Sequence, residues 1–191
     1  VERVTPQNET TQQLGFFADV VNDELNKDCE LNFEHKLIVD TSDFEILIKE
    51  LKEQKSIAFK AFADVQSALT SYITGFAFAY NDKAFYIPVG HSNIENQLRT
   101  EDVLSQLKPV FEDEKIQKSV FDAKTQYNIL RNYGICLKGI YFDVMLASYV
   151  KDAARKHDLD IQALEHLGHA IIPYGLFDKK NPLKFSDTPC E

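Results

Sequence analysis

The sequence predicts an α/β fold built on a mixed sheet with flanking helices. Three strand candidates follow one another at residues 56–63, 72–80 and 84–90, with connections short enough for an antiparallel meander. After residue 100 helical and strand-like segments alternate, which is typical of strands joined through helices. A hydrophobic content of 44% in 191 residues is enough for one globular domain.

The N-terminal part is predicted to be an extension of that domain. Residues 1–13 are polar and contain Pro6, whereas residues 14–25 have the apolar spacing of a short helix. We therefore assign residues 1–35 to a linker or extension and residues 36–191 to the domain.

The domain is predicted to begin with a strand at Lys36–Val39, followed by an amphipathic helix. Thr41 or Ser42 is suited to the N-cap, because a hydroxyl can accept a hydrogen bond from a free N–H of the first turn. Helical spacing of i, i+3, i+4 and i+7 is kept by four apolar residues, Phe44, Leu47, Ile48 and Leu51.

The meander opens with SIAFKAFADVQ, residues 56–66, which has the composition of a buried strand except for Lys60. The next two strands are separated by Asn-Asp-Lys at 81–83, a combination typical of a hairpin turn. A lysine in the middle of an apolar strand needs an explanation.

The second half of the chain is predicted to alternate helix and strand. Thr100 is the expected N-cap of a helix with Glu101 and Asp102 in its first turn, and Pro109 is expected to end or kink its last turn. Further elements are a strand at 115–121, a helix at 123–134 ended by Gly134, a short strand before a helix from about Asp143, and a helix at 160–168 capped by Gly168.

Composition excludes several classes of protein. The formal net charge of -9 disfavours a stand-alone nucleic-acid binder, which needs a broad basic surface. No apolar run approaches 18 residues, and residues 1–13 lack the pattern of a signal peptide. Three widely spaced cysteines, Cys29, Cys136 and Cys190, indicate isolated thiols in a reducing cytosol.

Four strings in order make the chain resemble the 3′–5′ exonuclease domain of family A DNA polymerases, the DNA polymerase I type. The strings are ITGFAFAYNDKAFYIPVGH, LKPVFEDEKIQKSVFDAK, ILRNYGICLKGIYFDVMLASYV and RKHDLDIQALEHL. The resemblance implies an RNase H-like (DEDD exonuclease) fold. It also implies a site in which four carboxylates hold two divalent metals that cleave the 3′-terminal phosphodiester.

Measured against that family pattern, the metal ligands are replaced. Lys60 and Phe62 occupy the places of the first Asp-x-Glu pair, and the register counted back from Gly75 agrees. A slipped register puts Ala63 and Val65 there instead, again without a carboxylate. Gln126 takes the place of the second-motif Asp. The third motif, Tyr-x-x-x-Asp, is expected beyond residue 191.

We therefore expect a catalytically degenerate exonuclease-like domain, because a cation at Lys60 would repel Mg²⁺ and a neutral Gln126 cannot balance its charge. No cofactor is expected, with Mg²⁺ as the exception if the ligands have been relocated. Expected partners are the polymerase module of the same parent chain and, through that enzyme, DNA. We expect a cytoplasmic monomer without membrane contact.

Three alternatives stay open at this point. One is an active metal-dependent exonuclease with relocated ligands, and another is an RNase D-like processing enzyme. The third is a single-stranded DNA-binding module that uses basic and aromatic residues near the old cleft, namely Lys118, Phe121, Lys124, Tyr127 and Arg131.

The remaining polar candidates are better explained by structural roles. Asp122 and Asp143 precede helices and are expected to cap them, and Asp64 lies past the end of the predicted strand. The HDLD string at 157–160 is expected to form a loop and a cap. Surface, loop or packing roles are expected for three histidines, His91, His166 and His169.

Overall fold

We analysed a computed structural model, which describes residues 34–67, 70–171 and 185–187. The chain divides into two parts that are described separately. One part comprises residues 32–157 and 173–191, and the other comprises residues 1–31 and 158–172. The predicted helix at 14–25 lies outside the described residues.

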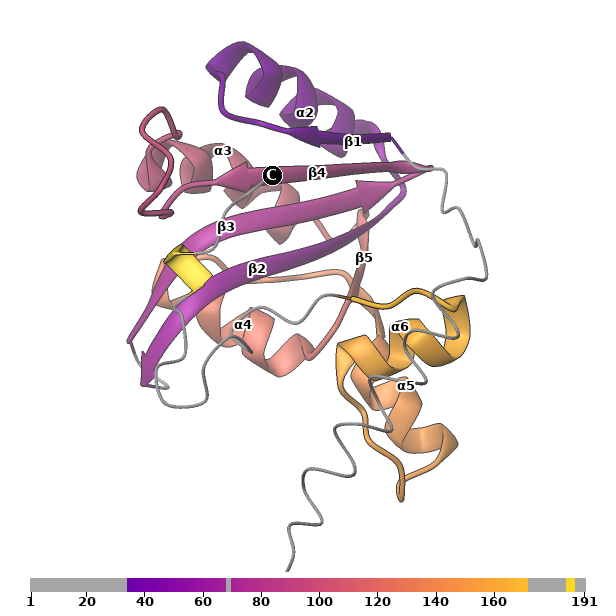
Figure 1. Cartoon of the computed structure of the whole chain (residues 1–191). Coiled ribbons are helices and arrows are strands. Elements are labelled where there is room, and N and C mark those ends of the chain that lie inside the picture. Colours follow the sequence, from indigo (N-terminus) through magenta and orange to yellow (C-terminus); the bar gives the residue numbers. More distant parts are fainter. Residues whose placement is uncertain (1–33, 68–69, 172–184, 188–191) are drawn as a thin grey trace, which may run out of the picture. The chain divides into compact units, whose positions relative to one another are not determined.

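A six-stranded mixed sheet forms the larger part, in the order β1-β4-β3-β2-β5-β6 (Figure 1). Strands β2, β3 and β4 pair antiparallel, whereas β1, β5 and β6 each pair parallel with a neighbour. The predicted α/β fold with a meander is therefore confirmed. The strand bounds are Glu34–Leu37, Ser56–Ser67, Thr70–Tyr80, Lys83–Pro88, Gln117–Val120 and Ile140–Asp143 for β1 to β6.

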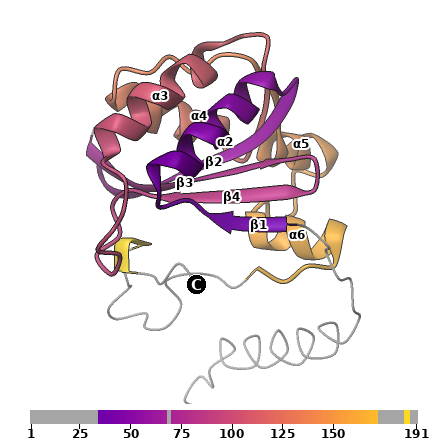
Figure 2. The same ribbon diagram turned by 90° about the horizontal axis from the view of Figure 1, so that it is seen from above.

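Three helices, α2, α3 and α4, lie on the same face of this sheet (Figure 2). The helix bounds are Thr41–Glu53 for α2, Thr100–Glu112 for α3, Ala123–Asn132 for α4 and Val144–Lys151 for α5. The core between sheet and helices is rich in aromatic rings: Phe76 and Phe78 of β3 both contact Phe111 of α3, each with 6.0 Å between ring centroids. All three phenylalanines are at most 1% exposed.

Strand β2 has one face in the core and the other outside it. Ile57, Phe59 and Ala61 point into the core, where Phe59 packs against Phe111 at 5.0 Å between centroids. Because side chains alternate along a strand, Lys60 and Phe62 point to the opposite face, and both are half-buried. The strand that was predicted to be buried apart from Lys60 is therefore buried on one face only, and the alternation explains the lysine.

Helix caps follow the sequence in some places and not in others. Asp122 and Asp143 cap α4 and α5 as predicted, accepting hydrogen bonds from backbone N–H groups of the first turn. Two other predicted caps are wrong. Thr41 and Ser42 lie inside α2, and Thr100 lies inside α3, where its hydroxyl donates to the carbonyl of Val89 at 3.1 Å.

The structure also tests the predictions for the hairpin at 81–83 and for Pro109. The hairpin at 81–83 is confirmed, with Asn81 at a φ of 41° and Tyr80 paired with Lys83. Pro109 does not end α3, which continues to Glu112. Near the C-terminal end, residues 185–187 form a short 3-10 helix, η1.

The smaller part has one described element, helix α6, which spans Leu159–Leu167. Gly168 follows it with a φ of 64°, a left-handed conformation that costs glycine little, so the predicted stop is confirmed. No helix in the described part of the chain is long and apolar enough to span a membrane.

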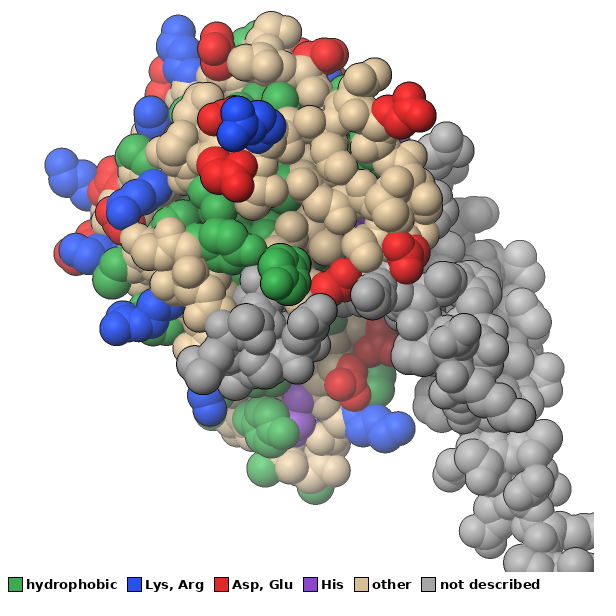
Figure 3. Space-filling model, turned by 90° about the vertical axis from the view of Figure 1, so that its left-hand side faces the viewer, with side chains coloured by type: hydrophobic (Ala, Val, Ile, Leu, Met, Phe, Trp, Pro, Cys, Tyr) green, Lys and Arg blue, Asp and Glu red, His purple; other side chains and the backbone are tan. Residues whose placement is uncertain are grey.

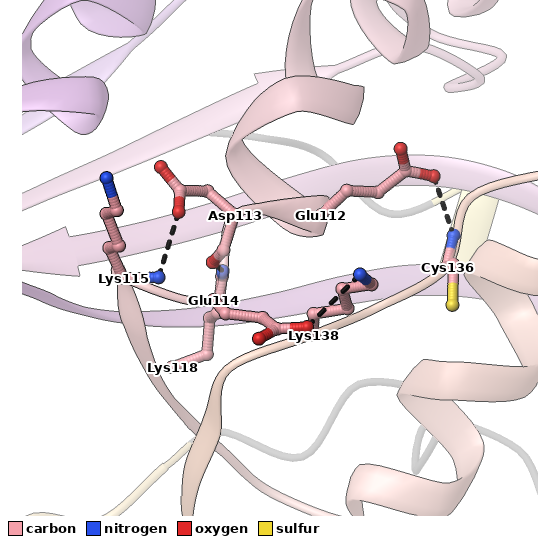
Figure 4. A network of polar contacts seen from close by, with 7 residues as sticks. All are labelled: Glu112, Asp113, Glu114, Lys115, Lys118, Cys136 and Lys138. Carbon is pink, nitrogen blue, oxygen red and sulfur yellow. Dashed lines mark hydrogen bonds and ion pairs between the residues drawn. The ribbon is translucent and has the colours of Figure 1, made fainter.

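Lys118 of β5 is the only fully buried cation among the described residues. Its side chain is 0% exposed, and its amine donates to the backbone carbonyl of Asp113 in the turn after α3 (Figure 4). Burial lowers the pKa of the Lys118 amine to about 8, although the charge of Asp113 partly opposes this effect. Lys118 therefore helps to hold the Asp113 turn, but its charge destabilises the fold.

Replacing Lys118 by methionine is expected to stabilise the domain at pH 7 and to change its pH dependence. Between pH 8 and the ordinary lysine pKa of 10.5, the unfolded wild type binds more protons than the folded state, so its stability rises with pH. Lys118→Met lacks this rise, so its advantage should shrink by up to about 3 kcal/mol across that window.

Urea unfolding at a series of pH values from 7 to 10 measures this difference. Lys115→Met is the matched control, because Lys115 is exposed and lies only three residues away. If the free energy of unfolding changed with pH in the same way for the wild type and Lys118→Met, the lowered pKa of Lys118 would be contradicted.

Candidate functional site: a pocket beside Lys60

A pocket of about 250 Å³ lies between β2, the start of α4 and η1. It brings together the three positions that the sequence analysis placed at the metal site, Lys60, Phe62 and Gln126. The other lining residues are Ala61, Ala63, Phe121, Asp122, Thr125, Ile129 and Phe185.

The Lys60 amine lies over aromatic rings in this pocket. Its Nζ atom is 5.1 Å from the centroid of Phe62 and 5.9 Å from that of Phe121, distances typical of cation–π contact. Burial lowers the pKa of Lys60, and the negative charge of Asp122 opposes part of that shift. The amine therefore occupies an apolar and partly desolvated position.

The side-chain amide of Gln126 is hydrogen-bonded to the backbone of β2. Its Oε1 atom accepts a hydrogen bond from the N–H of Ala61 at 2.7 Å, and its Nε2 atom donates to the carbonyl of the same residue at 3.4 Å. The ladder between β2 and β5 stops at Ala58, so the side-chain amide continues the pairing where no strand is available. Gln126, which is 3% exposed, thus fastens α4 to the sheet.

An aromatic cluster fills the space beside Lys60. Phe62 stacks face to face on Phe185 of η1, with 4.5 Å between centroids and 6° between ring planes. Tyr86 contacts the edge of Phe62, and its hydroxyl shares a 2.6 Å hydrogen bond with His91. A Cβ atom at Gly75 would lie 2.1 Å from the Tyr86 hydroxyl oxygen, so glycine leaves room for this tyrosine.

Hydrogen bonds hold η1 in place at the rim of the pocket. The N–H of Phe185 donates to Asp64 at 3.1 Å, and the N–H of Ser92 donates to the carbonyl of Ser186 at 2.9 Å. The Ser92 hydroxyl also donates to Asp187 at 2.8 Å. A segment more than 90 residues from its partners in sequence therefore supplies one wall of the pocket.

The carboxylates near the pocket already have local partners. Asp122 accepts from the N–H and hydroxyl of Thr125, and Asp143 accepts from four backbone N–H groups, two of them at Asp122 and Ala123. Asp64 lies inside β2 rather than past its end, which corrects the prediction. The described lining residues contain one carboxylate, so they do not fit a two-metal site.

Among the described residues, no group of three or more His, Cys, Asp or Glu side chains is placed to hold a metal ion. The printed sequence nevertheless corrects the expectation for the third motif. Tyr174 and Asp178 have the Tyr-x-x-x-Asp spacing, so a match to this motif lies within the chain rather than beyond residue 191. Both residues lie outside the described residues, so Asp178 has to be tested by experiment.

The basic and aromatic residues of the DNA-binding alternative are only partly brought together in the structure. Lys118 is not available to DNA, because its side chain is fully buried. Lys124 and Arg131 are exposed on α4, and Arg131 donates to the hydroxyl of Tyr127 at 2.9 Å. Phe121 lines the pocket instead. On the face shown in Figure 3, basic and acidic side chains are interspersed.

The remaining histidines have structural surroundings. His91 is buried, its Nε2 atom shares a hydrogen bond with the Tyr86 hydroxyl, and its backbone N–H donates to the side-chain oxygen of Gln97. His157 is also buried, shares a 2.8 Å hydrogen bond with the Ser148 hydroxyl and stacks on Tyr149. In the smaller part, His166 and His169 are exposed. The positions of His91, His166 and His169 agree with the roles inferred from the sequence. At 157–160 the prediction is only partly confirmed, because Asp158 occupies the N-cap position of α6 without a side-chain hydrogen bond to the helix.

Comparison with solved structures supports the fold. The polymerase domain of Pol1 from M. smegmatis, solved with DNA primer-template and dNTP, matches 70% of this chain and 23% of its own, at 19% identity and a TM-score of 0.57. Trypanosoma brucei RNase D, solved with GMP, matches 73% of this chain and 43% of its own, at 16% identity and a TM-score of 0.57. At these identities the likeness shows the fold alone, and it confirms the predicted RNase H-like architecture.

Sequence comparison identifies the family. DNA polymerase I of Pseudomonas aeruginosa is 35% identical over 159 residues, which cover 80% of this chain and 17% of the relative. DNA polymerase I of Synechocystis is 27% identical over 203 aligned positions, covering 100% of this chain and 20% of the relative. The chain thus spans about a fifth of these relatives. The family described as DNA polymerase I, ribonuclease H-like domain, matches residues 63–171, more than half of the chain, and the chain belongs to that family.

Proposed function

We propose that this domain is a degenerate 3′–5′ exonuclease-like module without metal-dependent nuclease activity. The observation that carries the proposal is the composition of the pocket, in which a lysine, a phenylalanine and a glutamine stand where the resemblance implies carboxylates. A divalent metal needs several anionic oxygens, and Lys60 would repel it at close range.

The contacts that two of these side chains already make support the same proposal. Gln126 uses both polar atoms on Ala61, and Phe62 is stacked against Phe185. Opening the pocket to a metal and a phosphate would break these contacts. The module would then serve DNA polymerase I as a scaffold, supporting the polymerase module and its path for DNA in replication and repair.

Incubation with 3′-labelled single-stranded DNA and Mg²⁺ or Mn²⁺ is expected to leave the DNA intact. Thermal unfolding should likewise show no specific stabilisation by either metal, because a ligand that binds only the folded state raises its stability. Two aspartates are the carboxylates to test as relocated ligands, Asp122 and Asp178.

If the DNA were shortened in a metal-dependent way, and if this shortening disappeared in Asp122→Ala or Asp178→Ala, the proposal would be wrong and an active exonuclease would be favoured. Shortening that persists unchanged in both variants and in Gln126→Ala points to a contaminating nuclease. A further purification step should then remove it.

Gln126→Ala is expected to lower the free energy of unfolding by roughly 1–3 kcal/mol, because the buried N–H of Ala61 loses its acceptor. Urea unfolding measures the change. Asn128→Ala is the matched control, since Asn128 is exposed on the same helix and its loss should cost less than about 0.5 kcal/mol. Equal stabilities for the two variants would show that Gln126 is not a structural fastener.

A second candidate function is single-stranded DNA contact through the exposed face of α4. Lys124, Tyr127 and Arg131 share this face at i, i+3 and i+7, and the guanidinium carbon of Arg131 lies 5.8 Å from the Tyr127 ring centroid. Alternating cations and aromatic faces suit a single strand, which offers phosphates and unpaired bases.

Fluorescence anisotropy with a labelled oligonucleotide separates this function from a pure scaffold. If α4 contacts DNA, Lys124→Ala/Arg131→Ala should weaken binding and reduce the slope of log K against log salt by about 1.4, or about 0.7 for each lost phosphate contact. Lys49→Ala/Lys52→Ala removes two exposed cations from α2 and serves as the charge-matched control. Equal losses in both double variants would indicate non-specific attraction alone.

A further inference from the structure

Lys60 differs from the other cations of the domain in what surrounds its amine. Several cations of the domain form ion pairs with carboxylates, such as Lys36 with Asp43 at 2.7 Å and Lys138 with Glu114 at 3.1 Å, and Lys60 is not among them. Its close neighbours are the rings of Phe62 and Phe121. Asp122 also lines the pocket and acts on the amine through its charge, without a direct ion pair.

This environment suits a lysine that reacts as a free amine. A lysine nucleophile must lose its proton, and desolvation without an ion pair favours that loss. Lys118 is desolvated too, but it lies fully buried with its amine bonded to Asp113. Lys60 is half-buried and lines a pocket of about 250 Å³, so a small molecule in the pocket would meet its amine.

We propose that Lys60 is a nucleophilic lysine that forms an imine with small aldehydes entering the pocket beside Phe62 and Phe121. The site is a modification site, and its ligand class is a carbonyl compound of a few carbon atoms. The proposal goes beyond the scaffold function and does not depend on it, because it concerns the reactivity of one amine and requires no metal or DNA.

The reaction balances without an added oxidant or reductant. The neutral Nζ atom attacks the carbonyl carbon, and a proton moves from nitrogen to oxygen to give a carbinolamine. Loss of the hydroxyl group as water then leaves a C=N bond, which water reverses. In its protonated form the imine carries a positive charge and lies against the same two rings, Phe62 and Phe121.

Limited reductive methylation of the 191-residue chain tests the proposal. Formaldehyde at low dose forms imines with accessible amines, cyanoborohydride fixes them, and mass spectrometry of peptides gives the extent at each lysine. Lys60 should be labelled at least about twofold faster than Lys124, an exposed lysine on the neighbouring helix. Labelling of Lys60 at or below the rate of Lys124 would overturn the proposal.

Three variants test whether the pocket, rather than the ordinary reactivity of a lysine, accounts for the labelling rate of Lys60. Lys60→Arg should abolish labelling of that peptide, whereas Lys124→Arg should leave the rate at Lys60 unchanged. Phe121→Ala admits water beside the amine, so the ratio of Lys60 to Lys124 labelling should fall towards one; urea unfolding checks that this variant is folded. A ratio unaffected by Phe121→Ala shows that the pocket does not activate the lysine, and it also overturns the proposal.

Discussion

The period-two alternation of β2 is the constraint on which both the core and the pocket depend. This strand lies between antiparallel β3 and parallel β5, so it cannot shift by one residue without exchanging its two faces. With Phe59 and Ala61 held in the core, Lys60 and Phe62 must face the other way. The same register that buries the phenylalanine core therefore builds the pocket.

The hydrogen bonds that fasten α4 to β2 are needed because β5 is short. The β2–β5 ladder ends at Ala58, which leaves the backbone of Ala61 without a strand partner on that side. The amide of Gln126 meets this need because it can donate and accept at once, as a peptide group does. A carboxylate at the same position could not donate to the Ala61 carbonyl. In this domain a glutamine at position 126 is thus structurally useful, whatever the position does in relatives.

The pocket also depends on contacts between segments that are distant in sequence. Phe185 stacks on Phe62 across 123 residues, and Gly75 leaves the space in which Tyr86 reaches His91. These contacts make the pocket an aromatic site in which the amine of Lys60 lies. A site of that composition is poorly suited to divalent metals and better suited to packing, to stacking or to amine chemistry.

Much of the fold could be predicted from the sequence alone, because local patterns determine local structure. The spacing of Phe44, Leu47, Ile48 and Leu51 fixed the buried side of α2, the turn at 81–83 fixed the hairpin, and Asp122 and Asp143 capped the helices they precede. The resemblance carried by four short strings pointed to the family. The caps at Thr41, Ser42 and Thr100 failed because neighbouring residues can take the same position and tertiary contacts can engage a hydroxyl elsewhere.

Only the tertiary structure decided what the side chains at the site do. Lys118 and Lys124 are both lysines near one helix in sequence, yet one is buried against Asp113 and the other is exposed. From the sequence by itself came the prediction that Lys60, Phe62 and Gln126 stand where the resemblance implies carboxylates. Only the structure shows that the Lys60 amine lies among aromatic rings, that Phe62 stacks on Phe185 and that Gln126 hydrogen-bonds to the backbone of Ala61. The physical reason is that burial and partners depend on packing between distant segments, which no local pattern encodes.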